Sequence, residues 1–339
     1  MLELVVVCPG WKQNRMFDLV IILPLQNHLL HPTASLEWTQ YANLPNGRRH
    51  AQAVMHNGKT YIGGGYSDKD EIDHHVYAYD PHTNMWDTLP DSPTRWFSVV
   101  VFDGNLVLVG GKEKSGGATN KVVSFDEKEQ RWVQDRITPM PTARMGSSAV
   151  AHASYLIVAG GWDDTRFRLN TVEIFDREKN CWFVAAPLPQ KAAEMKQALG
   201  NGTWFLLGGS NQSRSVFYVS LQSLVANAMQ TSTDHSSPQH PDSIWKSLPD
   251  VPYVFSSAAL SGNSLLALGG QSSLGWMIAA IYAYMPHTHS WLRIADMPLR
   301  VSRACAMTIP SSGELLLVGG KTRDNATLST IHKCTIRIK

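Results

Sequence analysis

Arginine residues gather in the segments that follow a Leu-Pro or Met-Pro dipeptide in this chain. Six of these dipeptides recur at a spacing of about 50 residues, at 44–45, 89–90, 140–141, 188–189, 248–249 and 297–298, and we call the residues after each of these six a leading segment. A guanidinium group presents a planar fork of donors that fits a carboxylate, so arginines at these recurring places are suited to binding carboxylates. The arginines concerned are Arg48, Arg49, Arg95, Arg144, Arg300 and Arg303.

Aromatic and further basic side chains accompany these arginines. Arginine, tryptophan and tyrosine contribute much of the binding energy at protein interfaces. For any single arginine a structural role is the favoured interpretation, because an arginine at the start of a strand can pair with a carboxylate of a neighbouring sheet; partner binding is predicted for the face as a whole. The acidic stretch around residues 68–73 could also satisfy arginines within the molecule. The remaining candidate partner-binding residues are Trp96, Trp162, Arg166, Tyr253 and Trp276.

Residues that could perform catalysis or bind a metal show no complete pattern. The pair His74-His75 is followed by no third ligand at a spacing typical of metal sites. His82 and His287 occupy equivalent Pro-His-Thr turns, so a shared turn explains them. The sequence also lacks a phosphate-binding glycine loop that opens a helix and a nucleophile elbow. We therefore predict no catalytic residue, no metal and no cofactor.

A glycine pair at the end of an apolar run recurs along the chain. In four repeats a tryptophan stands 21 residues after the second glycine, at Trp86, Trp132, Trp182 and Trp291, and Trp245 follows its pair after a longer loop. Two markers that recur in phase indicate one structural unit repeated about every 50 residues. The glycine pairs are Gly64-Gly65, Gly110-Gly111, Gly160-Gly161, Gly208-Gly209, Gly269-Gly270 and Gly319-Gly320.

Each repeat contains about four short strand-like segments, which predicts a β-propeller. In the third repeat, the apolar run 155–159 before Gly160 is typical of a strand buried on both faces. The glycines would give the backbone freedom as it leaves that strand. Because strands alternate in direction, we expect the leading segments and the loops after the glycine pairs to open on the same face, where function is most often carried.

The two ends of the repeat region complement each other. The last repeat ends before its tryptophan, whereas Trp38 has no glycine pair before it. We therefore predict that a strand near Trp38 lies alongside residues 331–338 and completes the last sheet, which removes exposed sheet edges. The predicted fold is an all-β, six-bladed propeller over residues 36–339, closed by an N-terminal outer strand.

With these features the chain resembles the kelch-repeat family. Its repeats match the glycine doublet, the strand ending in Asp and the later tryptophan in the segments 76–80, 122–126 and 172–176. The fourth and fifth repeats depart from this pattern, with 217–220 and Met285 where Asp is usual. The resemblance implies that a kelch-type propeller binds protein partners through one face. Members of this family that act as substrate receptors of ubiquitin ligases capture acidic peptides with such arginines. The resemblance therefore implies that arginines of this chain could bind acidic peptide segments.

Composition sets further bounds. A formal net charge of +2 gives no general attraction to nucleic acid or membrane, and four cysteines without framework spacing favour a reducing, cytoplasmic setting. Residues 1–35 lie outside the repeat and their apolar runs are too short to span a bilayer, so we expect a loose or packed leader. The polar, turn-rich segment 222–243 predicts a flexible insertion in the fourth blade.

These observations favour a non-enzymatic, monomeric protein-interaction module, with a substrate-recognition adaptor in ubiquitin ligation or a cytoskeletal scaffold as finer possibilities. The alternative is a kelch-type enzyme or sugar-binding propeller with its site at the central channel, which a buried histidine and carboxylate cluster at the channel mouth would favour. We further predict that Arg95→Ala combined with Arg144→Ala weakens partner binding and changes the melting temperature by only a few degrees.

Overall fold

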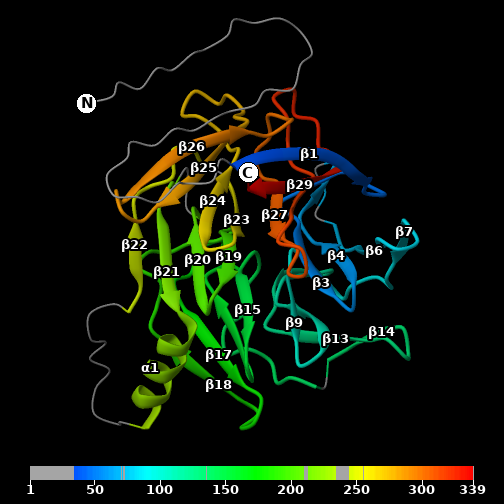
Figure 1. The fold of residues 1–339 in the computed structure, drawn as a ribbon. Coiled ribbons are helices and arrows are strands. Elements are labelled where there is room, and N and C mark those ends of the chain that lie inside the picture. The colour runs from blue at the N-terminus through cyan, green and yellow to red at the C-terminus, as the bar shows by residue number, and fades with distance from the viewer. Residues whose placement is uncertain are drawn as a thin grey trace, which may run out of the picture.

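The computed structural model describes residues 34–69, 71, 73–134, 136–209, 213–233, 244–254 and 256–338. Within these residues the chain forms six four-stranded antiparallel sheets, one for each predicted repeat (Figure 1). The predicted leader 1–35 lies almost entirely outside the described residues. No helix in the described residues is both long and apolar enough to cross a membrane.

Each sheet, or blade, runs from an inner first strand to an outer fourth strand. The first blade contains β3 (Gln52–His56), β4 (Lys59–Gly63), β6 (Val76–Asp80) and β7 (Met85–Thr88). The second contains β9 (Ser98–Phe102), β10 (Asn105–Val109), β13 (Val122–Asp126) and β14 (Arg131–Val133). The third contains β15 (Ser148–His152), β16 (Tyr155–Ala159), β17 (Val172–Asp176) and β18 (Cys181–Ala185).

The remaining three blades follow the same order. The fourth contains β19 (Lys196–Gly200), β20 (Thr203–Leu207), β21 (Val216–Ser220) and β22 (Lys246–Leu248). The fifth contains β23 (Ser257–Ser261), β24 (Ser264–Leu268), β25 (Ala280–Met285) and β26 (Ser290–Asp296). The sixth contains β27 (Cys305–Thr308), β28 (Leu315–Val318), β29 (Thr330–Ile338) and β1 (Ala34–Asn43). The inner strands neighbour one another in a closed ring, from β3 through β9, β15, β19, β23 and β27 back to β3, which is a propeller.

The N-terminal strand closes the last blade, as predicted. Strand β1 pairs antiparallel with β29, and Trp38 lies opposite Cys334 (Figure 1). The sheet order β1-β29-β28-β27 therefore joins the two ends of the repeat region. This pairing occupies the outer edge of β29, which would otherwise present unpaired backbone groups.

The glycine pairs occur where one blade meets the leading segment of the next. Gly319 has φ +59°, and a Cβ built on it would lie 2.2 Å from the backbone oxygen of Arg48. The following amide, Gly320 N, donates a hydrogen bond to that same oxygen at 2.8 Å. Only glycine allows both the left-handed backbone and this close approach. The doublet is thus an attachment point between blades.

The recurring tryptophans also join neighbouring blades. Trp132 Nε1 donates to Pro90 O and Trp182 Nε1 donates to Thr138 O, each at 2.8 Å and each toward the end of the preceding blade. The apolar clusters follow the same rule, since Val100 and Val107 of the second blade pack with Phe175 of the third. Apolar burial therefore lies between blades and stabilises the ring as a whole.

The fourth blade differs from the prediction. The segment 222–243, expected to be flexible, begins with helix α1 (Leu221–Thr233) between β21 and β22. Leu221, Leu224, Val225 and Ala228 are buried in one cluster with residues of the third and fourth blades. Their helical spacing gives α1 an apolar stripe, and its burial stabilises a helix where turn-rich composition predicted a loop. Residues 234–243 lie outside the described part of the chain.

Candidate partner-binding face and channel mouth

The leading segments and the loops after the glycine pairs lie on one face, as expected. β2 (Arg48–Arg49) pairs with β5 (Tyr66–Ser67), and β8 (Thr94–Arg95) pairs with β11 (Lys112–Glu113), which continues to β12 (Gly116–Ala118). Isolated bridges join Met145 with Trp162, Val254 with Gln271, and Ser302 with Lys321 in the same way. We call these paired segments the binding face.

Three successive positions of each leading segment have different surroundings. The third position has a left-handed backbone in every blade where it is described, although only one of the five residues is glycine: His50 (φ 56°), Trp96 (56°), Gly146 (61°), Glu194 (56°) and Arg303 (58°). L-residues adopt this conformation at a cost, which the surrounding structure must offset. Such repeated strain marks a candidate functional site.

Hydrogen bonds connect these left-handed residues from blade to blade. His50 N donates to Arg303 O at 2.8 Å, Gly146 N to Trp96 O at 2.9 Å, and Glu194 N to Gly146 O at 2.8 Å. Each of the five stands two residues before the first residue of an inner strand. His50, Trp96, Gly146 and Glu194 line the end of the central channel, and the backbone of Arg303 is hydrogen-bonded to His50 there. We call these five residues the channel mouth.

The first position of the leading segment faces the interior of the blade. Arg144 is fully buried, and its Nη2 lies 2.9 Å from Oε2 of Glu173, which is also buried. Its Nη1 donates to the backbone oxygens of Gly160 and Thr171 at 2.9 and 3.1 Å. Arg144 therefore joins the second and third strands of its own blade and cannot contact a partner.

Arg48 repeats this arrangement in the first blade. Its Nη2 lies 3.0 Å from Asp73 Oδ2, and its Nη1 donates to the oxygens of Gly64 and His75 at 3.2 and 3.0 Å. The guanidinium also stacks 4.5 Å from the ring centroid of Tyr77. The sequence-based assignment of Arg48 and Arg144 to partner binding is thus wrong. The structural alternative holds, but with a carboxylate of the same blade instead of a neighbouring one.

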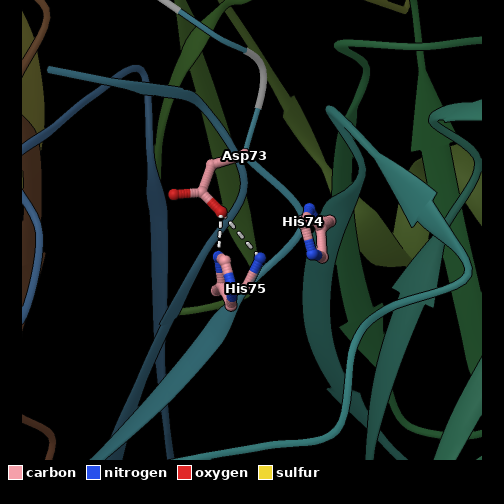
Figure 2. A group of neighbouring side chains, drawn as sticks. All are labelled: Asp73, His74 and His75. Atoms are coloured by element: carbon pink, nitrogen blue, oxygen red, sulfur yellow. Dashed lines mark hydrogen bonds and ion pairs between the residues drawn. The ribbon is translucent and has the colours of Figure 1, made fainter. Parts of the chain in front are cut away.

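The residue next to the histidine pair supplies the third potential metal ligand that the sequence did not suggest. Donor atoms of Asp73, His74 and His75 lie within 4.8 Å of one another (Figure 2). However, Asp73 Oδ1 accepts from His75 N at 2.8 Å and lies 2.6 Å from His75 Nδ1, while Oδ2 meets Arg48. Both carboxylate oxygens therefore already serve the buried arginine and its loop, so a metal ion would compete with these bonds.

Tyr253 also occupies a first position. Its ring packs edge-to-face against Tyr282 of β25, with centroids 5.9 Å apart. Tyr282 lies two residues before Tyr284, which pairs with Trp291. Glu173 lies at the equivalent position of the third blade, two residues before Phe175, which pairs with Trp182. The contact is therefore an aromatic counterpart of the Arg144–Glu173 pair, and the structure does not bring Tyr253 to the channel mouth.

The second and third positions bring other predicted residues together. Arg49 stacks 4.8 Å from the ring centroid of Tyr66, and Tyr66 packs edge-to-face on both Trp96 and His50. Across the channel mouth, His50 Nδ1 lies 3.9 Å from Glu194 Oε1. Arg95, at the second position of the next blade, is half-buried and lies opposite Lys112 in the β8–β11 ladder.

Electrostatic effects show that positive charge dominates this cluster. Burial, followed by the nearby cations Lys196, Arg303, Arg49 and Lys321, lowers the pKa of His50 well below its usual value. Burial raises the pKa of Glu194, although several cations oppose this effect. Burial and Glu194 raise the pKa of Tyr66 to about 12. Glu194 is therefore one carboxylate among many cations.

The outer part of the binding face carries exposed apolar side chains beside arginines. Phe167, Leu274 and Trp276 have exposed fractions of 68%, 82% and 46%. Arg323 stacks 4.0 Å from the ring centroid of Trp276, and Arg168 stacks 4.2 Å from that of Trp162. We call these residues the outer rim. Of the other predicted residues, Arg166 is exposed on the same loop as Phe167, and Arg300 is exposed in the sixth leading segment.

A cavity of about 340 Å³ occupies the channel between the inner strands. Its wall is mainly aliphatic, and its polar end includes His50, Trp96, Glu194, Lys196 and Cys305. Residue types alone do not single out His50, Glu194 or Lys196, because they differ at equivalent positions of the six repeats. Alignment of the leading segments by their distance from the inner strand would have identified the third position.

Comparisons with known proteins agree with this architecture. A model of the kelch motif matches residues 47–93 and 143–189. Beta-scruin of Limulus polyphemus is 24% identical over 305 residues, covering 83% of this chain and 31% of its own length. Kelch-like protein 35 of Mus musculus is 27% identical over 177 residues, covering 52% and 29%. Kelch-like protein 25 of Homo sapiens is 22% identical over 258 residues, covering 74% and 40%.

A solved structure shows the same fold. The structure of YjhT superposes with a TM-score of 0.67 at 16% identity, covering 87% of this chain and 99% of that one. This chain spans less than half the length of the curated relatives named above.

Proposed function

Because this chain is a kelch-repeat protein, we propose that it is a non-enzymatic interaction module that binds a protein partner through the binding face. The partner segment is acidic and also contains apolar side chains. Its carboxylates meet the cations around the channel mouth, and its apolar residues contact the outer rim.

The charge distribution is the observation that carries this proposal. Arg49, Arg303 and Arg166 all act on Tyr66, and Arg168 and Arg303 both act on Glu194, so the cations of several blades converge on one area. The protein as a whole has a formal net charge of only +2, so this density is local. A local positive field favours an acidic segment over a neutral or basic one and increases its association rate.

The outer rim supports a protein partner over a free anion. Phe167, Leu274 and Trp276 are large apolar residues exposed to solvent on loops of a rigid scaffold. Tryptophan and arginine in contact, as in Trp276 with Arg323, are typical of residues that contribute strongly to binding. An acidic peptide with apolar residues beside its carboxylates would use both parts of the face.

The test is binding of fluorescent acidic peptides that contain tryptophan or leucine, with basic peptides of matched composition as controls. Arg303→Ala and Trp276→Ala should each weaken binding of the best acidic peptide by about tenfold or more. Arg177→Ala serves as the matched control. Arg177 is exposed on the turn between the third and fourth strands of the third blade, away from the binding face, and pairs with Asp103 of the second blade. Equal loss in all three variants, or equal binding of basic peptides, would contradict the proposal.

A finer form of the proposal concerns the cellular role. We propose that the propeller presents its partner as a substrate-recognition adaptor in ubiquitin ligation, in the cytoplasm. Co-purification of a ubiquitin-ligase scaffold together with the partner would support this role, and ubiquitination of the partner should depend on Arg303. Association with filaments, without any ligase component, would instead favour a cytoskeletal scaffold.

One observation favours the alternative of a kelch-type enzyme or sugar-binding propeller. His50 and Glu194 form a histidine and carboxylate pair at the channel mouth, with a 3.9 Å separation between their nearest nitrogen and oxygen atoms. A neutral histidine beside a carboxyl group of raised pKa can act in proton transfer. Turnover of a sugar that is lost in both His50→Ala and Glu194→Gln would favour this alternative.

A further inference from the structure

One lysine interrupts an otherwise uncharged ring inside the channel. Lys196 begins β19 and pairs with Leu207, the last residue of β20. In the other five blades the residue at the start of the inner strand, which pairs with the end of the second strand in the same way, has an uncharged thiol, hydroxyl or amide group. These residues are Gln52, Ser98, Ser148, Ser257 and Cys305. The charge at this position is therefore particular to the fourth blade.

The side chain of Lys196 lines the cavity. In the described part of the chain it makes no hydrogen bond and no ion pair. Burial and Arg303 lower the pKa of Lys196, while Cys305 and Glu194 act in the opposite direction. The side chain is half-buried. An ammonium group at the end of a cavity without a bonded partner favours a ligand that supplies an anion.

The wall beyond Lys196 is apolar. Val54, Val100, Val150, Ala198 and Ala259, one from each of five inner strands, line the cavity. Among the described lining residues, Glu194 is the carboxylate, and burial raises its pKa. A volume of about 340 Å³ is at the small end of the range for ligand pockets. The cavity thus combines a cationic end with an aliphatic interior.

We propose that the central channel binds a small amphipathic carboxylic acid, with its carboxylate at Lys196 and its apolar part between the inner strands. This site is distinct from the peptide-binding outer rim. It requires no covalent step, and it does not depend on whether the binding face recognises a protein partner.

The test uses straight-chain carboxylates from acetate to hexanoate, and the primary amide of each, titrated into the intact chain by calorimetry or ligand-observed NMR. Carboxylates should bind and the amides should not. Each methylene that enters the channel should tighten binding roughly fourfold. Equal binding of an acid and its amide, or an affinity independent of chain length, would overturn the proposal.

Two variants change the charge balance in opposite directions. Lys196→Met keeps the side-chain length and removes the charge, so hexanoate affinity should fall by at least about tenfold. Glu194→Gln removes the competing carboxyl group, so affinity should stay equal or increase. Lys179→Met, on an exposed turn of the third blade, is the control. Melting curves identify variants that fail to fold, and an unchanged affinity in folded Lys196→Met would also overturn the proposal.

The peptide and hexanoate assays separate the two proposals. Trp276→Ala should weaken peptide binding and leave hexanoate binding unchanged, because Trp276 does not line the cavity. Loss of hexanoate binding in this variant would show that the ligand lies on the outer rim and not in the channel, and would overturn the assignment.

Discussion

Arg48 and Arg49 are neighbours in the chain and lie in different environments. The side chain of Arg48 is fully buried and bonds to Asp73, Gly64 and His75 of its own blade. The side chain of Arg49 stacks on Tyr66, which packs against two residues of the channel mouth. Arg144 and Arg303 show the same contrast in other blades. The position within the leading segment, and not the residue type, decides whether an arginine bonds within its blade or packs beside the channel mouth.

The contrast has an electrostatic basis. A buried guanidinium needs a carboxylate and acceptors for its remaining donors, and the first position supplies these from the second and third strands. Around the channel mouth several cations share Glu194. Charge is therefore nearly balanced inside the blades and unbalanced at the mouth, which is the arrangement expected when one set of residues holds the fold and the other attracts a ligand.

The largest effect on stability is expected from Arg144→Ala. Removal of one member of a buried ion pair leaves Glu173 charged and without its main partner, and typically costs about 3–5 kcal/mol of unfolding free energy. Urea denaturation measures this change. Arg303→Ala should cost far less, and the double variant Arg144→Met, Glu173→Leu should recover part of the loss. A similar cost for Arg144→Ala and Arg303→Ala would remove the distinction between the two positions.

The attachment of blades at the glycine pairs can be tested with two alanine substitutions. Gly319→Ala combines a left-handed backbone with a Cβ 2.2 Å from Arg48 O, so we expect a loss of about 2–4 kcal/mol. Gly313 also has a positive φ, +73°, but nothing lies within 4 Å of a Cβ built there. Gly313→Ala should therefore cost only about 1 kcal/mol. Equal losses would mean that backbone strain alone requires the doublet.

The Arg48–Asp73 pair should give stability a defined pH dependence. Burial alone would raise the pKa of Asp73, but Arg48 and hydrogen bonds from His75 outweigh it and lower the pKa. The resulting stabilisation is complete above the pKa of an unfolded aspartate, about 3.9, and is lost as the pH falls through the lower folded value. Unfolding free energies measured from pH 7 to pH 2 should show this loss. Asp73→Asn should reduce it, and an unchanged profile would contradict the role of this pair.

The smallest effect is expected at an exposed ion pair. Arg177 and Asp103 are each about half exposed and form a salt bridge on the surface. Such pairs contribute about 0–1 kcal/mol, so Arg177→Ala should change the unfolding free energy by no more than about 0.5 kcal/mol. Thermal denaturation of this variant sets the baseline for the buried arginines. A loss as large as that of Arg144→Ala would show that burial does not explain the contrast.

The architecture could be predicted from the sequence because its markers are periodic. The glycine pairs and tryptophans recur in phase since each contacts the adjacent blade, and Trp38 indicated the closing strand because the last repeat had no tryptophan of its own. Helix α1 was missed even though the apolar residues Leu221, Leu224, Val225 and Ala228 have helical spacing, because the polar residues after them dominated the composition.

The candidate site was less accessible to sequence reasoning. Arg144 and Glu173 meet only after three strands have paired, and nothing near Arg144 in the chain indicates its partner. The channel mouth is defined by a shared backbone conformation, while its side chains are as different as Gly146 and Arg303. A pattern in φ is not visible in residue types, and therefore His50, Glu194 and Lys196 were not selected.

The pairing of β1 with β29 has a consequence for how the molecule assembles. During synthesis the first strand of the propeller leaves the ribosome long before the strand that it must join. Five blades can form in order from neighbouring segments, but the sixth has to wait for β29, about 290 residues after β1. The ring therefore closes late, and until then β1 lacks its partner strand, and unpaired strand edges are prone to aggregation.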